Sequence, residues 1–178
     1  MPSLGLIVVI VLVSAFIFFG LASFVGAPYV PSQKKYVRRL FEHLHIDKDD
    51  VVVDLGSGDG VVLRIAASFG AAAYGYEINP LLVGISRWLS AGSKRVHVRL
   101  QNVWAARFPE DTTLVYAFSV SRDEPKLTVL LQQEADRLGR PLKLVYFGSP
   151  FAHLSATLSF EAYHLYVFHP LQPKSLKV

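Results

Sequence analysis

Hydrophobic and polar positions divide the chain into an apolar N-terminal segment and a mixed body. From Leu4 to Val25 there are 22 residues, and only two glycines and two serines interrupt the strongly apolar or alanine side chains. A helix rises about 1.5 Å per residue, so this segment would be roughly 33 Å long, enough to cross a hydrocarbon core of about 30 Å. The pattern predicts one N-terminal transmembrane helix, within an anchor of residues 1–27.

A cleaved signal peptide is the alternative for this segment, because Val25-Gly26-Ala27 resembles a small-residue cleavage site. However, no Lys or Arg precedes the apolar run, which is longer than the roughly 7–15 residues of a typical signal core. A retained anchor is therefore favoured. Lys34, Lys35, Arg38 and Arg39 follow the span. The positive-inside rule then predicts that the body lies on the cytoplasmic face of the membrane, or on the matrix face in a mitochondrion.

The body alternates between helical spacing and short apolar runs. It begins with a stiff connector in which two prolines fix the backbone, and Ser32 is the predicted N-cap of the first helix. Helices are predicted at 34–45, 61–69, 80–91 and 124–138, and strands at 51–53, 71–77, 96–100, 112–120 and 142–147. Aromatic-rich residues 157–168 predict one or two antiparallel strands. This order predicts an α/β fold, a Rossmann-like doubly wound sheet that is mostly parallel with antiparallel C-terminal strands.

Composition narrows the chemistry. The 178 residues include 18 Lys and Arg, 14 Asp and Glu, six His and no Cys. Without Cys there is no disulfide, thiolate zinc site or cysteine nucleophile. All the charges follow Gln33, so the mean hydropathy of +0.35 reflects the apolar start, and a net charge of +4 is too small to imply a nucleic-acid partner. The six His show no spacing typical of a metal site, and no metal is predicted.

A glycine-rich turn after the first predicted strand carries the main functional signal. The buried strand that contains the apolar run 51–53 is expected to end at Asp54, and Gly56, Gly58 and Gly60 follow within six residues. Ligands of open α/β sheets bind at the carboxyl ends of the strands, and glycine lets the backbone approach them closely. The dinucleotide fingerprint requires a sixth-position glycine where Val61 stands, and a Walker loop requires Gly-Lys-Ser/Thr, which is absent. The Asp54 carboxylate would repel a phosphate and suits a ligand with a cationic amine.

The block 51–60 resembles the first motif of the class I, seven-strand S-adenosylmethionine-dependent methyltransferases. The resemblance implies S-adenosylmethionine as the cofactor. It implies that Asp54 orients the methionine amino group, and that Gly56, Ser57, Gly58, Asp59 and Gly60 pass close to the ligand.

A second acid is expected at the end of the second strand, where it would accept hydrogen bonds from both ribose hydroxyls. Glu77 stands 23 residues after Asp54, where a strand–helix–strand unit would place it. The resemblance also implies that Ile78 packs against the adenine. The segment Asn102-Val103 follows the third strand, and the Asn102 side-chain carbonyl would accept from the adenine amine.

The order of motifs over about residues 4–105 is similar to a narrower group. These are the membrane-anchored lysine methyltransferases that modify mitochondrial carriers and the c-subunit of ATP synthase, with their prokaryotic relatives. The resemblance rests on the apolar start, Pro28-Tyr29-Val30-Pro31-Ser32, the glycine turn and Gly75-Tyr76-Glu77-Ile78-Asn79-Pro80. It implies that residues 28–46 form a connector and helix over the cofactor, with Tyr29, Pro31 and Ser32 at the pocket. A rigid linker is the alternative for this segment. Residues 47–178 would be the methyltransferase domain.

The implied activity is protein-lysine N-methyl transfer to a membrane or membrane-proximal protein. The chain departs from the family at two places: the family tends to have an acid where Asn102 stands, and it has a Phe-Gly-Val-Pro-like turn where this chain has Phe118-Ser119-Val120-Ser121. The second departure borders the expected acceptor entrance, so it bears on the identity of the substrate. Tyr29, Tyr116 and Phe151 are candidate aromatic walls, although core packing is expected for any one of them. No general base stands out. Alternatives are methylation of a lipid, small molecule or RNA, and a non-catalytic membrane-tethered nucleoside-binding protein.

Overall fold

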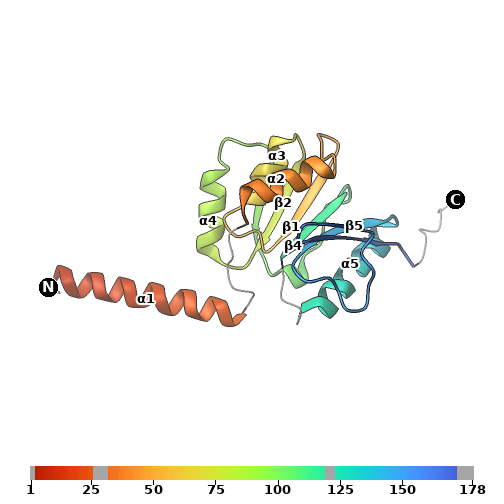
Figure 1. The fold of residues 1–178 in the computed structure, drawn as a ribbon. Coiled ribbons are helices and arrows are strands. Elements are labelled where there is room, and N and C mark those ends of the chain that lie inside the picture. Colours follow the sequence, from red (N-terminus) through yellow and green to blue (C-terminus); the bar gives the residue numbers. More distant parts are fainter. Residues whose placement is uncertain (1–2, 26–31, 119–122, 172–178) are drawn as a thin grey trace. The chain divides into compact units, whose positions relative to one another are not determined.

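The computed structural model describes residues 3–25, 32–118 and 123–171 of the chain. The chain forms two compact units, Met1–Val30 and Pro31–Val178. Figure 1 shows the first as a single helix and the second as a sheet with helices on its faces.

The N-terminal unit contains helix α1 (Leu4–Val25), which has the predicted range. Its described side chains, residues 3–14, are all exposed, and Leu4 has 79% of its surface accessible. Within the described part of the chain, no helix has the combination of length and hydropathy needed to cross a membrane. The structure therefore does not support the predicted transmembrane helix.

The second unit alternates helices and strands as predicted. Its helices are α2 (Lys34–His43), α3 (Val61–Ser68), α4 (Pro80–Leu89), the short 3-10 helix η1 (Val103–Ala105) and α5 (Glu124–Leu138). Its strands are β1 (Val51–Leu55), β2 (Ala72–Glu77), β3 (Val96–Leu100), β4 (Leu114–Phe118), β5 (Leu142–Phe147), β6 (Leu158–Phe160) and β7 (Tyr163–Phe168).

The strands form one seven-stranded sheet in the order β3-β2-β1-β4-β5-β7-β6. The first five strands in this order pair in parallel, whereas β7 is antiparallel to both β5 and β6. This confirms the predicted α/β class, with a mostly parallel sheet and antiparallel strands at the C-terminus. The chain runs outward from β1 to β3 and then returns to β4, so the topological switch point lies between β1 and β4. Ligands of open α/β sheets bind at the carboxyl ends of the strands beside such a point.

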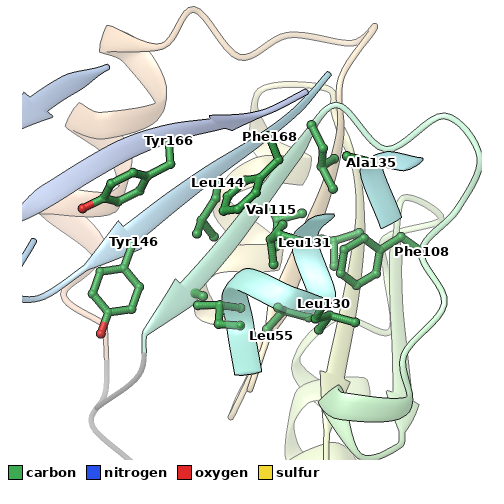
Figure 2. Close-up of a cluster of buried hydrophobic side chains, with 14 of the residues drawn as sticks. Leu55, Phe108, Val115, Leu130, Leu131, Ala135, Leu144, Tyr146, Tyr166 and Phe168 are labelled. Atoms are coloured by element: carbon green, nitrogen blue, oxygen red, sulfur yellow. The ribbon is translucent and has the colours of Figure 1, made fainter. Parts of the chain in front are cut away.

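A separate hydrophobic core lies on each face of the sheet. On one face, α2 and α3 pack on β1, β2 and β4, with Phe41, Leu63 and Val52 fully buried. On the other, α5 packs on β1, β4, β5 and β7, and Figure 2 shows Leu131, Val115 and Leu144 meeting at its centre. The β-branched run 51–53 is buried on both faces, as expected for a central parallel strand.

Several predicted boundaries shift for local reasons. Strand β1 continues one residue beyond the predicted end at Asp54, because Leu55 still pairs with both neighbouring strands. Helix α2 stops at His43, since the chain turns through a left-handed conformation at His45. The predicted N-cap Ser32 is wrong: Gln33 occupies that position and makes no side-chain cap hydrogen bond.

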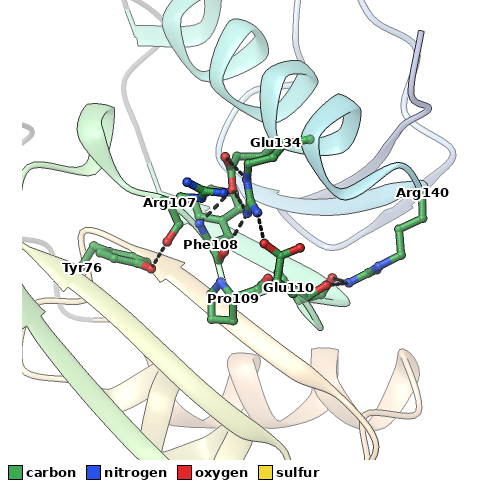
Figure 3. A network of polar contacts seen from close by, with 9 residues as sticks. Tyr76, Arg107, Phe108, Pro109, Glu110, Glu134 and Arg140 are labelled. Carbon is green, nitrogen blue, oxygen red and sulfur yellow. Dashed lines mark hydrogen bonds and ion pairs between the residues drawn. The ribbon is translucent and has the colours of Figure 1, made fainter. Parts of the chain in front are cut away.

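The connection between β3 and β4 is fastened to α5 by a polar network (Figure 3). The buried Glu134 carboxylate accepts from the Phe108 N–H at 2.8 Å and from Arg137 at 2.6 Å. Arg137 in turn donates to the Phe108 carbonyl and to Glu110, whereas Arg140 donates to the Glu110 carbonyl. These hydrogen bonds provide partners for backbone N–H and carbonyl groups of the β3–β4 connection, which has little regular structure.

Candidate functional site

The carboxyl ends of β1, β2 and β4 bring one row of residues together. Asp54 on β1 is in register with Gly75 on β2 and with Tyr116 on β4. Side chains alternate between the faces of a strand, so Asp54 and Tyr116 point to the face that carries α2 and α3. An acid therefore lies beside the topological switch point, in the central strand of the sheet.

Asp54 is a buried carboxylate with 3% of its surface exposed. No hydrogen bond reaches its side chain from the residues that the structure describes. Burial raises the pKa of the Asp54 carboxyl from 3.8 to about 8, and the nearby Glu77 and Asp59 carboxylates add to the rise. A buried carboxylate without donors is costly in its charged form, so a cationic ligand group at this position would stabilise it.

The loop after β1 uses its glycines in different ways. Gly56, Gly58 and Gly60 all have positive φ, a region that other residues rarely adopt. A Cβ added to Gly56 would meet no atom within 4 Å, so open space lies beside this backbone. At Gly60 a Cβ would meet the Ser86 hydroxyl of α4, so this glycine serves the packing of the loop against a helix.

Glu77, at the end of β2, connects this loop to the start of α4. Its Oε2 accepts from the Gly58 N–H at 2.9 Å, and its Oε1 accepts from the Asn79 N–H at 2.8 Å. Each carboxylate oxygen can accept a second hydrogen bond, so two acceptor positions remain. The predicted position of Glu77 is therefore confirmed, while ribose binding by it stays a prediction.

Two residues that shape this site were not predicted from the sequence. Asn79 caps α4, because its side-chain oxygen accepts from Leu81 and Leu82 N–H groups. The pattern of Asn before Pro at a helix start signals such a cap. Gly75 must lack a side chain because an added Cβ would lie 2.5 Å from the Ser57 hydroxyl.

The two other loop residues expected near the cofactor, Ser57 and Asp59, differ in their contacts. The Ser57 hydroxyl is buried against Gly75 and has no hydrogen-bond partner among the described residues. The Asp59 carboxylate accepts from the Val61 N–H at 3.2 Å and pairs with Arg64 at 3.4 Å. Asp59 therefore bonds to the first residue of α3 and to Arg64 in the same helix, while a cofactor contact by its side chain stays a prediction.

The predicted adenine side lies at the ends of β2 and β3. Ile78 is exposed directly after Glu77, which suits stacking on a planar ring. Asn102 follows β3 and is exposed, but its side-chain oxygen already accepts from the Trp104 N–H at 3.1 Å. Val103 packs partly against the core below α5. The adenine roles of these three residues stay predictions.

Ser32, which precedes α2, contacts the Tyr116 side chain of the site. Ser32 is half-buried and hydrogen-bonded to the Tyr116 hydroxyl, which also meets the hydroxyl of Tyr163 on β7. Burial, more than the neighbouring Tyr163, raises the pKa of Tyr116, so the phenol stays protonated at neutral pH. Ser32 therefore contacts the side chain of the strand residue that is in register with Asp54, while its cofactor contact stays a prediction. The predicted pocket residues Tyr29 and Pro31 lie outside the described residues.

The expected acceptor side is less defined. The turn 119–121 lies outside the described residues. Phe151 stacks on Tyr166, with ring centroids 4.5 Å apart, and belongs to the core rather than to an exposed wall. Within the described ranges, no three His, Asp or Glu side chains lie close enough to hold a metal ion.

The site fits a cofactor that carries a cationic amine and a diol. Asp54 offers a buried carboxylate that has no donor among the described residues, Glu77 offers two free acceptor positions, and Gly56 leaves room beside the backbone between them. These features match S-adenosylmethionine better than a phosphate ligand, which Glu77 and an ionised Asp54 would repel.

Curated relatives of the chain include protein-lysine N-methyltransferases. The ATP synthase c-subunit lysine N-methyltransferase of Xenopus laevis is 34% identical over 116 residues, which cover 64% of this chain and 50% of that protein. The Homo sapiens enzyme of that name is 29% identical over 130 residues, covering 71% and 53%. The adenine nucleotide translocase lysine N-methyltransferase of Mus musculus is 36% identical over 81 residues, covering 43% and 35%. The chain thus spans about half the length of the first two relatives. No family model matches it.

Solved structures share the fold. An RNA methyltransferase from Salinibacter ruber, in complex with S-adenosyl-L-homocysteine, has a TM-score of 0.69 and 26% identity, covering 84% of this chain and all of that one. An S-adenosylmethionine-dependent O-methyltransferase from Thermotoga maritima has a TM-score of 0.61 at 11% identity, covering 83% and 69%, and supports the fold alone. The chain is therefore a relative of lysine N-methyltransferases with the seven-strand fold of S-adenosylmethionine-dependent methyltransferases.

Proposed function

We propose that the protein is an S-adenosylmethionine-dependent methyltransferase that modifies the side-chain amine of a lysine in a protein. The observation that carries the proposal is the pair of buried carboxylates, Asp54 and Glu77, at the ends of adjacent strands around an open glycine turn. The similarity to named lysine N-methyltransferases favours lysine as the acceptor.

The residues of the chain would hold the cofactor from both ends. Asp54 would pair with its amino group, and Glu77 would accept from its ribose hydroxyls while keeping the Gly58 N–H in place. When bound, S-adenosylmethionine supplies a methyl group on a sulfonium, which a neutral amine attacks in line as the carbon–sulfur bond breaks. The chain's main contribution is then to position and orient the reactants.

The acceptor lysine must lose a proton before it can attack. Tyr116 is a buried aromatic wall beside Asp54, and its raised pKa argues against a role as general base. A dry, aromatic site disfavours the charged ammonium and so lowers the pKa of an entering lysine. In the proposed mechanism the proton leaves to solvent before the amine is enclosed.

The proposal is tested with the full chain, tritiated S-adenosylmethionine and two acceptor fractions, cell membranes and total RNA. We expect label in a protein band, recovered as methyl-lysine after acid hydrolysis. Asp54→Asn and Glu77→Gln should abolish this label, whereas Glu110→Gln, at an exposed position remote from the site, should retain it. If calorimetry detects no binding of S-adenosylmethionine to the wild-type protein, every methyltransferase hypothesis is contradicted.

RNA is the second candidate acceptor, because the Salinibacter ruber neighbour is named an RNA methyltransferase. Label in RNA and not in protein would favour it. Label in extracted lipid would favour a lipid acceptor, and cofactor binding without transfer to any fraction would favour a non-catalytic nucleoside-binding protein.

We also propose that α1 attaches the enzyme to a membrane, with the second unit on the cytoplasmic or matrix face. The support is the absence of charge before Lys34 and the exposure of large apolar side chains along residues 4–13. Transfer of such side chains from water into lipid is favourable. Lys34 and Lys35, which follow, are exposed and suit anionic headgroups. Sedimentation of the protein with membranes after carbonate washing, and its loss on deletion of residues 1–25, would test the attachment.

A further inference from the structure

The segment from Ile78 to Pro109 differs in charge from the rest of the body. Its 32 residues contain five Lys and Arg and no Asp or Glu. The segment comprises α4, edge strand β3 and η1. This segment, which includes the edge strand of the sheet, therefore carries only basic charges, although the net charge of the whole chain is small.

The same segment holds an unusual share of exposed apolar side chains. Eleven large hydrophobic residues are exposed among the described residues outside α1, and six of them lie in this segment: Ile78, Leu81, Trp88, Leu89, Leu100 and Trp104. Scattered single apolar side chains are normal on a surface, so the significant ones are the three that share one helix, Leu81, Trp88 and Leu89 of α4.

Helix α4 arranges part of this group along one line. Leu81 and Trp88 are seven residues apart, two turns of helix, so they lie on the same side of α4. Leu82, Val83 and Ser86 form the buried side. Trp88 has 77% of its surface exposed, and Leu81 and Leu89 have 47% and 44%. The outward side of α4, about 15 Å long, is thus apolar where a solvated helix would be polar.

Basic groups surround the C-terminal end of this apolar side. Lys94 and Arg95 follow α4 in the turn that leads to β3, and both are exposed. Arg87 lies along the sheet edge, where its guanidinium donates to the Val98 carbonyl at 2.8 Å. Arg87 therefore occupies the edge of β3, which disfavours pairing with a strand of another chain.

We propose that the outward side of α4, with Lys94 and Arg95, is a second membrane contact that lies on an anionic lipid surface. Exposed Leu and Trp beside Lys and Arg, without acids, are typical of segments that lie in the headgroup region. Aliphatic Leu81 and Leu89 favour lipid over RNA, because nucleic-acid interfaces are mostly polar. Helix α4 begins beside Glu77, so this contact would hold the mouth of the cofactor site close to the membrane plane.

The two tryptophans of the chain allow a direct test. In Trp104→Phe, Trp88 is the only tryptophan. In Trp88→Phe, Trp104 remains as a matched reporter on the α5 side, where it lines a shallow groove with Pro125 and Lys126. Each full-length variant is mixed with vesicles of phosphatidylcholine, with or without phosphatidylserine, that contain brominated lipid as a quencher. Cosedimentation reports attachment by α1, and quenching reports contact by each tryptophan.

We expect Trp88 to shift to shorter wavelength and to be quenched on the anionic vesicles more than on the neutral ones, with Trp104 little quenched. Lys94→Glu with Arg95→Glu, added to Trp104→Phe, should reduce the contacting population about tenfold or more, since each basic residue near the surface contributes about 1 kcal/mol. Cosedimentation with Trp88 unquenched would overturn the proposal while leaving α1 attachment and methyl transfer intact. It would also be overturned by equal quenching of the two tryptophans. Two lipid-free responses would overturn it as well: a Trp88 shift induced by RNA alone, or one that grows with protein concentration.

Discussion

Asp54 and Glu77 are buried carboxylates at the ends of neighbouring strands, but their surroundings are opposite. Glu77 accepts from two backbone N–H groups, which orient it whether or not a ligand is present. Asp54 has no such donors among the described residues, and its pKa of about 8 reflects mainly burial. Asp54 is therefore the group whose ionisation should respond to a cationic ligand.

The first prediction concerns stability and pH. Because the pKa of Asp54 is about 8 in the folded chain, above the ordinary value of 3.8, the folded state binds this proton more tightly than the unfolded state. The resulting stabilisation is complete below pH 4 and is lost as the pH rises toward 8. Asp54→Asn resembles the protonated acid, so its melting temperature should exceed that of the wild type increasingly from pH 5 to pH 8. Each kcal/mol would appear as about 2–4 °C in a thermal scan. A constant difference across this range would contradict the assigned shift.

A second prediction concerns cofactor affinity. If Asp54 must be ionised to pair with the amino group, binding requires loss of its proton below pH 8. S-adenosylmethionine affinity should then rise from pH 6 to pH 8, up to about tenfold per pH unit, with release of a proton. Calorimetry in two buffers of different ionisation enthalpy measures the release. In Asp54→Asn the affinity should be low and this proton release should disappear.

Glu77→Gln provides a third prediction. The substitution replaces one acceptor oxygen by an NH2 donor, which must face the N–H of Gly58 or of Asn79. An unsatisfied buried donor costs about 1–3 kcal/mol, so urea unfolding should show a loss of stability of that size. Cofactor affinity should fall by at least about tenfold, because the turn loses its anchor and the ribose loses an acceptor. Glu77→Gln with wild-type stability and affinity would show that the carboxylate has neither role.

At the scale of elements, the sequence correctly predicted those helices and strands whose ends are marked by a local pattern of residues. The ranges of β3, β5 and α5 were predicted residue for residue, because apolar periodicity and clear terminators mark them. The acids Asp54 and Glu77 were placed correctly, since a strand–helix–strand unit has a narrow length. What was not predicted depends on tertiary contacts: the pairing of Leu55 with two strands, and the contact of Ser32 with Tyr116 instead of the helix start. No local pattern encodes such contacts.

The fastening of the β3–β4 connection to α5 allows a fourth prediction. Glu134 is buried between the Phe108 N–H and Arg137, and breaking a buried pair typically costs about 3–5 kcal/mol. We expect Glu134→Leu to lower the free energy of unfolding by about 2–4 kcal/mol, because Arg137 remains partly paired with Glu110. Glu110→Gln is the control: that side chain is 69% exposed, so its loss should cost less than about 1 kcal/mol. Equal effects in urea unfolding would contradict the assigned importance of burial.

At the scale of the whole molecule, the topology brings together groups that are far apart in the sequence. The return of the chain from β3 to β4 places Tyr116 beside Asp54, and β7 adds Tyr163 on the same face. Ser32 approaches from before α2. Together with Glu77 on β2, the site draws on five separate segments, which explains why the sequence identified the two acids but not the contacts between the segments.

The last prediction separates attachment to a membrane from catalysis. The described core of the second unit draws on no residue before Val37, so deletion of residues 1–25 should leave thermal stability and S-adenosylmethionine affinity unchanged. The deletion should remove the confinement of enzyme and acceptor to one surface. Confinement to one surface raises the effective concentration of the two partners for each other. Loss of such confinement typically lowers their apparent affinity by about 10²–10⁴-fold. Methylation of a membrane fraction should therefore fall by at least about a hundredfold, while methylation of the same acceptor dissolved in detergent should change little. If both rates fall together, α1 supports the catalytic unit itself; if neither falls, attachment by α1 has no part in acceptor selection.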